Sequence, residues 1–451
     1  MSDALAESDA PGPAASFAVR GVIEGFYGPP WSWEVRAEVM AWCHQRGMDL
    51  YLYAPKDDPL HRQRWREPYG AEAIAGFEAL VAQETLAVGF AISPGLSMDY
   101  ASPDDRRALG AKVDQVVDLG VTTIALLLDD IPVRPGLGPD HAALTTWLRD
   151  HLDGRARLVM TPTEYTGVRS TPYLDALAEG SPPEVPIGWT GTTVVCDQIT
   201  VAEAQARAAV LGDRPPFLWD NYPVNDALMS DRLFMGPLRG REPGLAAVCS
   251  GYAANPMVQG RASKPALASI AAYVTGADPG VGWRADLGSL AVFAEACDGA
   301  WPRDLVAAVI GADPSAEPLA RLEAWLVAAK ACEAPGLDDE VGPWLAQVHR
   351  EARVGLAAVN LIRAASVADG DAHPGGGDVG EAAVTLAATW LPLRRSEVSV
   401  LGTRGSLRPV LGQSSTGAWT YHAGALTEGA NAVDDLVRHA LALAARHGDR
   451  G

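Results

Sequence analysis

Residues 122–130 read TTIALLLDD. The apolar run at 124–128 is typical of a strand that is buried on both faces, as the strands of a parallel sheet are. Two carboxylates, Asp129 and Asp130, follow at once, and burying them is costly unless they are paired or used. The stretch therefore predicts a buried parallel strand whose carboxyl end holds two acidic side chains.

The same alternation of a short apolar run and a helical pattern extends in both directions from this strand. The eight predicted strands are residues 17–24, 49–54, 88–93, 122–128, 157–161, 185–188, 217–219 and 245–250. The predicted helices are residues 33–46, 71–85, 103–119, 139–152, 172–178, 201–211 and 265–274, with an irregular link at 229–239 after the seventh strand. Eight such units in about 260 residues predict an α/β fold, a (β/α)8 TIM barrel.

A doubly wound open sheet is the alternative fold for alternating strands and helices. It would normally carry a glycine-rich phosphate turn after the first strand. Residues 24–28 read EGFYG instead, and two aromatic residues stand where a phosphate would lie. This segment favours the barrel.

The second half of the chain has a different pattern. Helical periodicity dominates residues 287–390 and returns at 432–446. We therefore expect a disordered tail at 1–16, a catalytic barrel at 17–283 and a mainly α-helical C-terminal domain at 284–451. The fold of about residues 394–451 stays open.

Composition excludes several classes of protein. The net charge of −20 repels phosphate backbones, which argues against nucleic-acid binding. No apolar stretch reaches the length of a membrane span. The five cysteines have no metal-binding spacing, and no metal or organic cofactor is implied. Residues 1–16 lack the features of a signal peptide, so we expect a cytoplasmic protein.

Polar and aromatic residues recur at the carboxyl ends of the predicted strands, where barrels build their active sites. Besides the aspartate pair, the candidates are Gly25, Tyr27, Lys56, Tyr165, Trp219, Asn221, Asp226 and Asn255. The aromatic residues, together with Trp189, have the size to wall a sugar pocket, and the amides and carboxylates suit sugar hydroxyls. Each residue also has an ordinary interpretation as a turn or packing residue.

The aspartate pair has two other interpretations. One is a helix cap followed by a satisfied loop carboxylate. The other is a metal site, but the DDxxD spacing of magnesium diphosphate enzymes is absent, because Val133 stands where the third aspartate would be. Neighbouring residues on a regular strand point to opposite faces. For Asp129 and Asp130 to face one ligand, the strand end must therefore twist or bulge.

Several motifs resemble those of a known family in the same order along the chain. They are RGVIEGFYG at 20–28, YAPKDDP at 53–59, AISPG at 91–95, LDDI at 128–131, PTEY at 162–165, WTG at 189–191 and WDN at 219–221. Together they resemble the family 84 glycoside hydrolases, β-N-acetylglucosaminidases that include the protein O-GlcNAcases. The resemblance covers roughly residues 18–276. The animal enzymes differ beside the pocket, with cysteine where Thr161 stands and phenylalanine where Leu128 stands.

The resemblance implies retaining hydrolysis in which the substrate's own 2-acetamido oxygen attacks the anomeric carbon and forms an oxazoline. It implies that Asp129 accepts a hydrogen bond from the acetamido N–H. Asp130 would protonate the leaving oxygen and then deprotonate water. Tyr165 would support the acetamido group, and Trp219 would wall the acetyl pocket. The residues implied to bind sugar hydroxyls are Gly25, Lys56, Asn221, Asp226 and Asn255.

The resemblance leaves the rest of the substrate open. The expected partner is a terminal β-linked N-acetylglucosamine, either on serine or threonine of a protein or on a glycan or cell-wall fragment. A non-catalytic N-acetylglucosamine-binding protein and a partner-binding scaffold are further alternatives. In some relatives the helical domain packs against a partner subunit. A homodimer that forms through residues 284–451 is therefore a further hypothesis for this chain.

Overall fold

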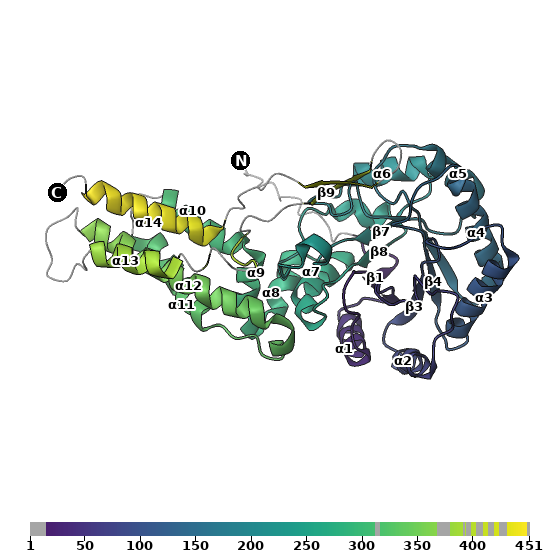
Figure 1. Ribbon diagram of the computed structural model, residues 1–451, viewed down its shortest axis with the longest axis horizontal. Coiled ribbons are helices and arrows are strands. Elements are labelled where there is room, and N and C mark those ends of the chain that lie inside the picture. Colours follow the sequence, from purple (N-terminus) through teal and green to yellow (C-terminus); the bar gives the residue numbers. More distant parts are fainter. Residues whose placement is uncertain are drawn as a thin grey trace, which may run out of the picture.

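A computed structural model of the chain has a barrel and, beside it, an elongated bundle of helices (Figure 1). The structure describes residues 15–311, 316–367, 379–390, 393, 398–402, 409–413, 419–423 and 431–448. The predicted tail at 1–16 lies almost wholly outside these residues, so it stays a prediction.

Eight parallel strands form the barrel. They are β1 Arg20–Glu24, β2 Leu50–Tyr53, β3 Ala87–Ile92, β4 Thr123–Leu127, β5 Arg157–Thr161, β6 Gly188–Trp189, β7 Phe217–Asp220 and β8 Gly251–Ala254. Strand β1 pairs with both β2 and β8, and a single bridge between Met160 and Ile187 joins β5 to the start of β6. The sheet therefore closes on itself, and the predicted TIM barrel is confirmed.

The helices of the barrel follow the strands in the predicted order. They are α1 Trp33–His44, α2 Ala71–Val81, α3 Pro103–Val117, α4 Leu137–Leu152, α5 Pro172–Gly180, α6 Val201–Val210 and α7 Lys264–Val274. Four of these helices have a side-chain cap at the N-terminus. There a side-chain oxygen accepts a hydrogen bond from a backbone N–H group, and the capping residues are Ser32, Ser102, Thr171 and Thr200. These caps satisfy N–H groups that a helix leaves unpaired, which explains why the helices begin there.

Two predicted strands were wrong in position. Of the predicted strand at 185–188, only Gly188 lies in a strand, because β6 is Gly188–Trp189. Pro186 has no N–H to donate to a neighbouring strand. Of the predicted strand at 245–250, the first three residues lie in a 3₁₀ helix, η2 Pro243–Ala247, and β8 begins only at Gly251. A short apolar run fits a helical turn as well as a strand, and Pro243 presets the helical φ angle. The link after β7 is irregular, as predicted, with a second 3₁₀ helix, η1 Ala227–Met229.

The C-terminal part is mainly helical, as predicted. Its helices are α8 Pro279–Asp286, α9 Ala291–Asp298, α10 Ala300–Gly311, α11 Ala316–Ala331, α12 Asp338–Val367, α13 Val379–Trp390 and α14 Ala432–Gly448. Short 3₁₀ helices, η3 Arg261–Ser263 and η4 Gly288–Leu290, and an antiparallel hairpin of β9 Pro409–Gln413 and β10 Trp419–Ala423 complete the described elements. Helix α12 contacts α11, α13 and α14.

The apolar core of the helices is distinct from that of the barrel but includes barrel residues. Leu326, Val348 and Leu436 belong to this second cluster of buried side chains, as do Met235 and Met257 from the barrel loops. The two parts therefore pack together through apolar contacts, and the domain boundary at residue 283 stays a prediction. Among the described helices, none combines the length and apolar composition that crossing a membrane requires.

Candidate active site

A cavity of about 650 Å³ lies at the carboxyl ends of the barrel strands. The ten residues singled out in the sequence all line it: Gly25, Tyr27, Lys56, Asp129, Asp130, Tyr165, Trp219, Asn221, Asp226 and Asn255. Its volume falls in the range of small-molecule sites, about 300 to 1,000 Å³. The barrel thus brings together residues that are up to 230 positions apart, as in the pair Gly25 and Asn255.

The two aspartates reach the same cavity because the chain turns sharply after β4. Asp129 is buried, and Asp130 has a φ angle of +53°, in the left-handed region. This turn replaces the alternation of a regular strand, which would point the two side chains apart. A left-handed conformation costs a residue with a side chain about 1 to 2 kcal/mol. Contacts elsewhere must therefore hold Asp130 in place.

Only one of the two carboxylate oxygens of Asp129 has a hydrogen-bond partner among the described residues. Its Oδ2 accepts a hydrogen bond from the ammonium of Lys56, and both side chains are buried. Its other oxygen, Oδ1, is also buried but has no hydrogen-bond partner among the described residues. Buried acceptors are nearly always paired in folded proteins. Oδ1 of Asp129 is therefore an acceptor available to an N–H or O–H group of a ligand in the cavity.

The carboxylate of Asp130 is held by two phenols. Tyr27 Oη donates to its Oδ2 at 2.8 Å, and Tyr165 Oη lies 2.9 Å from its Oδ1. Burial, reinforced by the negative charge of Asp130, raises the pKa of Tyr165 well above its usual range. Partial burial and the same charge raise the pKa of Tyr27. Both phenols therefore keep their protons at neutral pH.

Trp219 forms one wall of the cavity against the end of β1. A Cβ atom on Gly25 would lie 2.4 Å from Cζ2 of Trp219, so a side chain there would displace the ring. The indole Nε1 is buried without a hydrogen-bond partner among the described residues. The ring also faces the Lys56 ammonium, whose Nζ is 5.7 Å from the ring centroid.

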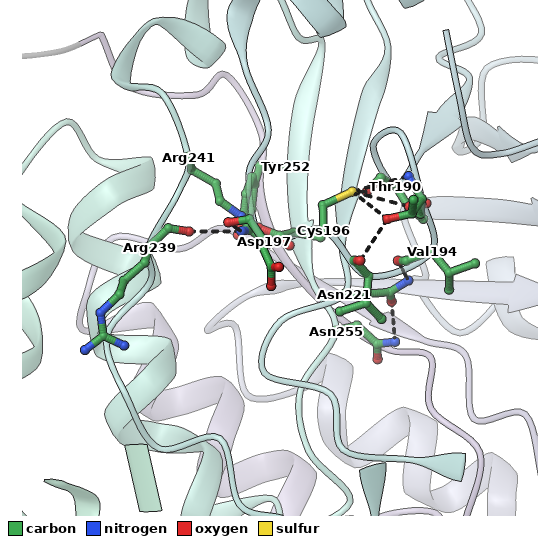
Figure 2. Close-up of polar contacts among 12 residues, drawn as sticks. Thr190, Val194, Cys196, Asp197, Asn221, Arg239, Arg241, Tyr252 and Asn255 are labelled. Carbon is green, nitrogen blue, oxygen red and sulfur yellow. Dashed lines mark hydrogen bonds and ion pairs between the residues drawn. The ribbon is translucent and has the colours of Figure 1, made fainter. Parts of the chain in front are cut away.

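A chain of amides runs along the adjacent ends of β1, β8 and β7, on the same side of the cavity as Trp219. Asn255 accepts a hydrogen bond from the Gly25 N–H at 3.1 Å and donates from Nδ2 to Asn221 Oδ1 at 2.9 Å. Asn221 in turn donates to the carbonyl of Val194 at 2.7 Å (Figure 2). Each amide has a fixed orientation because each uses both its oxygen and its nitrogen in this chain.

Asp226 comes from the irregular link after β7. Its Oδ2 accepts a hydrogen bond from the Tyr27 N–H at 2.7 Å. Burial, with a further contribution from the negative charge of Asp130, raises its pKa. Asp226 therefore places an acceptor at the cavity on the side of Tyr27.

Trp189, Glu24 and Asp220 are among the strand-end residues that do not line the cavity. Trp189 is fully buried and donates from Nε1 to the carbonyl of Gly167, so it is a packing residue, which was the ordinary one of its two interpretations. Glu24 and Asp220 are buried in ion pairs with Arg36 and Arg241. These arginines neutralise the strand-end charges, which makes Glu24 and Asp220 anchors of the barrel.

The sequence did not indicate two stretches of the cavity wall or one supporting residue. One stretch is the link after β7, where Val224, Ala227, Leu228, Met229, Arg232 and Phe234 line the cavity beside the predicted Asp226. The loop at 190–197 lines the cavity through Thr190, Thr193, Val194, Val195 and Asp197. The thiol of Cys196 lies inside this loop, in contact with Thr190 and Thr193 (Figure 2). The WTG motif at 189–191, which overlaps the start of this loop, was the available signal. Arg62, which donates to the Tyr27 phenol at 2.7 Å, carries no local signal.

Within the described ranges, no group of three or more histidine, cysteine, aspartate and glutamate side chains is arranged to hold a metal ion. The hydrogen-bonding side chains that line the cavity carry carboxylates, amides, phenols, threonine hydroxyls, the Lys56 ammonium and the Arg232 guanidinium. Such groups suit a neutral polar ligand with hydroxyl and amide functions.

The chain is similar to several known proteins. A family model for beta-N-acetylglucosaminidase matches residues 20–291. Protein O-GlcNAcase of Rattus norvegicus is 33% identical over 288 residues, which are 60% of this chain and 31% of the rat protein. Protein O-GlcNAcase of Mus musculus is 33% identical over 271 residues, which are 56% of this chain and 29% of the mouse protein. The chain thus spans less than a third of the length of these two relatives.

The fold of the whole chain also has a counterpart among solved structures. A mutant of the Thermobaculum terrenum O-GlcNAc hydrolase superposes with a TM-score of 0.74 over 96% of this chain and 97% of that chain. At 24% sequence identity this likeness concerns the fold. Because the family model matches more than half of the residues, we conclude that the chain belongs to the beta-N-acetylglucosaminidase family, the family 84 glycoside hydrolases.

Proposed function

We propose that this protein is a retaining exo-β-N-acetylglucosaminidase whose nucleophile is the 2-acetamido group of the substrate. The observation that carries the proposal is the buried Oδ1 of Asp129, which has no hydrogen-bond partner in the described part of the chain and lies next to a second carboxylate at Asp130. A hydrolase that used its own carboxylate as nucleophile would need no acceptor dedicated to an N–H group. Substrate-assisted enzymes do need one, because the acetamido group must be oriented and its growing positive charge offset.

Asp129 is the residue proposed to orient the acetamido group. Its Oδ1 accepts the acetamido N–H, which turns the acetamido oxygen toward the anomeric carbon. Lys56 holds the Asp129 side chain in place through Oδ2. As the oxygen attacks and the glycosidic bond breaks, positive charge grows on the acetamido nitrogen, and the Asp129 carboxylate stabilises it.

Asp130 is the proposed general acid and base. It donates a proton to the leaving oxygen as the oxazoline forms, and it then takes a proton from the water that opens the oxazoline. The anomeric carbon is attacked twice, so the β configuration is retained. Hydrogen bonds from Tyr27 and Tyr165 hold the carboxyl group in one orientation during both steps.

The remaining predicted lining residues are proposed to bind a single terminal sugar. Asp226, Asn255 and Asn221 offer acceptors and donors to the hydroxyls, and Trp219 walls the pocket for the acetyl methyl group. Gly25 lets the wall stand close to β1. A cavity of about 650 Å³ suits one sugar with part of its aglycone.

The aglycone is the least constrained part of the proposal. Similarity to two relatives named protein O-GlcNAcase favours N-acetylglucosamine linked to serine or threonine of proteins. The same chemistry on glycan or cell-wall fragments is the second candidate. A cytoplasmic location and a homodimer through the helical part stay predictions of the sequence.

Product stereochemistry during hydrolysis of 4-nitrophenyl N-acetyl-β-glucosaminide tests this proposal. Proton NMR of a fresh reaction distinguishes the two anomers before they equilibrate. We expect β-N-acetylglucosamine to form first. Initial formation of the α anomer contradicts a retaining mechanism. Binding of N-acetylglucosamine by folded protein without any turnover favours the alternative of a non-catalytic sugar-binding protein.

A further inference from the structure

Arg62 stands behind the cavity and contacts two groups that determine the position of Asp130. It lies in the segment between β2 and α2 and is only 5% exposed. Its Nη1 donates to the phenol oxygen of Tyr27 at 2.7 Å, and its Nη2 donates to the main-chain carbonyl of Asp130 at 3.2 Å. Arg62 does not line the cavity itself. It can therefore affect chemistry there only through Tyr27 and Asp130.

The first contact fixes the direction of a hydrogen bond at the proposed acid. An arginine side chain has donors and no acceptor. The Tyr27 oxygen must therefore accept from Arg62, which leaves the single phenol proton for Oδ2 of Asp130. Without Arg62 the phenol would be free to turn its proton elsewhere. Arg62 thus holds Tyr27 as a donor to Asp130.

The second contact supports the unusual backbone of Asp130. The left-handed φ angle of +53° is unfavourable for a residue with a side chain. The hydrogen bond from Arg62 Nη2 engages the carbonyl of this same residue. One planar guanidinium therefore restrains Asp130 at both its main chain and, through Tyr27, its carboxylate.

The surroundings of Arg62 do not assign it another partner. Within the described residues, no carboxylate forms an ion pair with it, and its Nε is buried without a hydrogen-bond partner. Burial lowers the pKa of Arg62, but Tyr27, Asp129 and Asp130 raise it more, so the net pKa is raised. The guanidinium keeps its charge and faces the acidic pair across Tyr27.

We propose that Arg62 is a positioning residue for Asp130, acting on its carboxylate through Tyr27 and on its main chain directly. This inference rests on the proposed function, in which Asp130 protonates the leaving oxygen. If Arg62 positions that acid, its loss slows substrates that need proton donation and spares those that do not. A purely structural role lowers the rate with every substrate by the same factor.

The test compares two aryl N-acetyl-β-glucosaminides on wild type, Arg62→Met and Arg62→Lys. The 4-nitrophenyl substrate has a good leaving group that needs little acid help, and the 4-methoxyphenyl substrate has a poor one. Acid catalysis contributes about 100- to 10,000-fold, so we expect Arg62→Met to lose about tenfold or more on the poor substrate and under about threefold on the good one. Lysine lacks the planar fork, so Arg62→Lys should have an intermediate ratio.

The ratio of the two rates is independent of how much of a variant is folded, because both substrates report the same active enzyme. Arg214→Met is the matched control, since Arg214 also donates to main-chain carbonyls, of Ser181 and Val185, away from the cavity. It should keep the wild-type ratio. An unchanged ratio in both Arg62 variants, with active wild type, overturns the inference alone. No turnover by folded wild type overturns the proposed function and the inference with it.

Discussion

Replacing Gly25 by alanine tests how closely the wall of the cavity fits the end of β1. The added Cβ would lie 2.4 Å from Cζ2 of Trp219. Carbon atoms in contact are about 3.5 to 4.0 Å apart, so the ring must retreat by roughly 1 Å. Trp219 is only 6% exposed and is held in β7, so it has little room to do so.

The size of the effect follows from this crowding. Overpacking a buried site costs about 1 to 3 kcal/mol, and we expect the free energy of unfolding of Gly25→Ala to fall by that amount in urea titrations. A misplacement of about 1 Å at a catalytic site can cost about 100-fold in rate. We therefore expect kcat/KM for 4-nitrophenyl N-acetyl-β-glucosaminide to fall by about 10- to 100-fold.

A second glycine provides the control for this experiment. Gly311 is the last residue of helix α10, and a Cβ there would meet nothing within 4 Å. Gly311→Ala should keep the wild-type kcat/KM and lose no stability, because alanine favours a helix more than glycine does. Wild-type stability and wild-type kcat/KM in Gly25→Ala would refute the reasoning about the Trp219 wall.

Three further predictions concern single side chains. Asp129→Asn removes the charge proposed to stabilise the acetamido nitrogen, so kcat/KM should fall by about 100- to 1,000-fold with good and poor leaving groups alike; a loss confined to poor leaving groups contradicts this role. Arg241→Met leaves the carboxylate of Asp220, which is 1% exposed, without its ion-pair partner, so the free energy of unfolding in urea should fall by about 3 to 5 kcal/mol. A fall of under about 1 kcal/mol would argue against a buried anchor. Burial lowers the pKa of His141 to about 3, so its stabilising contribution is present above the unfolded pKa of about 6.5 and is lost as the pH falls toward 3. His141→Gln should therefore reduce the drop in unfolding free energy between pH 7 and pH 5. An unchanged drop counts against the lowered pKa of His141.

Much of the barrel could be predicted because each unit carries its own local pattern. The run at 124–128 is long and apolar, and the bounds of β5 were predicted to the residue. The position of β8 could not be predicted, because the apolar run around Leu245 suits two backbone conformations. Only closure of the sheet determines which residues form the strand. Local pattern therefore gives the order of elements more reliably than it places a short strand.

The candidate site could be predicted to the extent that it depends on topology. Parallel strands bring their carboxyl ends to one face, so residues flagged at separate strand ends gather in one cavity. The supporting contacts depend on pairs far apart in sequence, such as Arg62 and Asp130, which are 68 positions apart. Whether a strand-end carboxylate faces the cavity or an arginine, as Asp220 does, is likewise set by a distant partner.

The central claim is that the substrate's acetamido oxygen is the nucleophile, and fluorination of that group tests it most directly. The measurement is kcat/KM for 4-nitrophenyl β-glucosaminides whose 2-acyl group carries from zero to three fluorine atoms. Each fluorine withdraws electrons and weakens the attacking carbonyl oxygen. The account predicts a steep, progressive fall across the series. A flat series would contradict it, because a nucleophile supplied by the protein does not depend on the electron density of the acyl group.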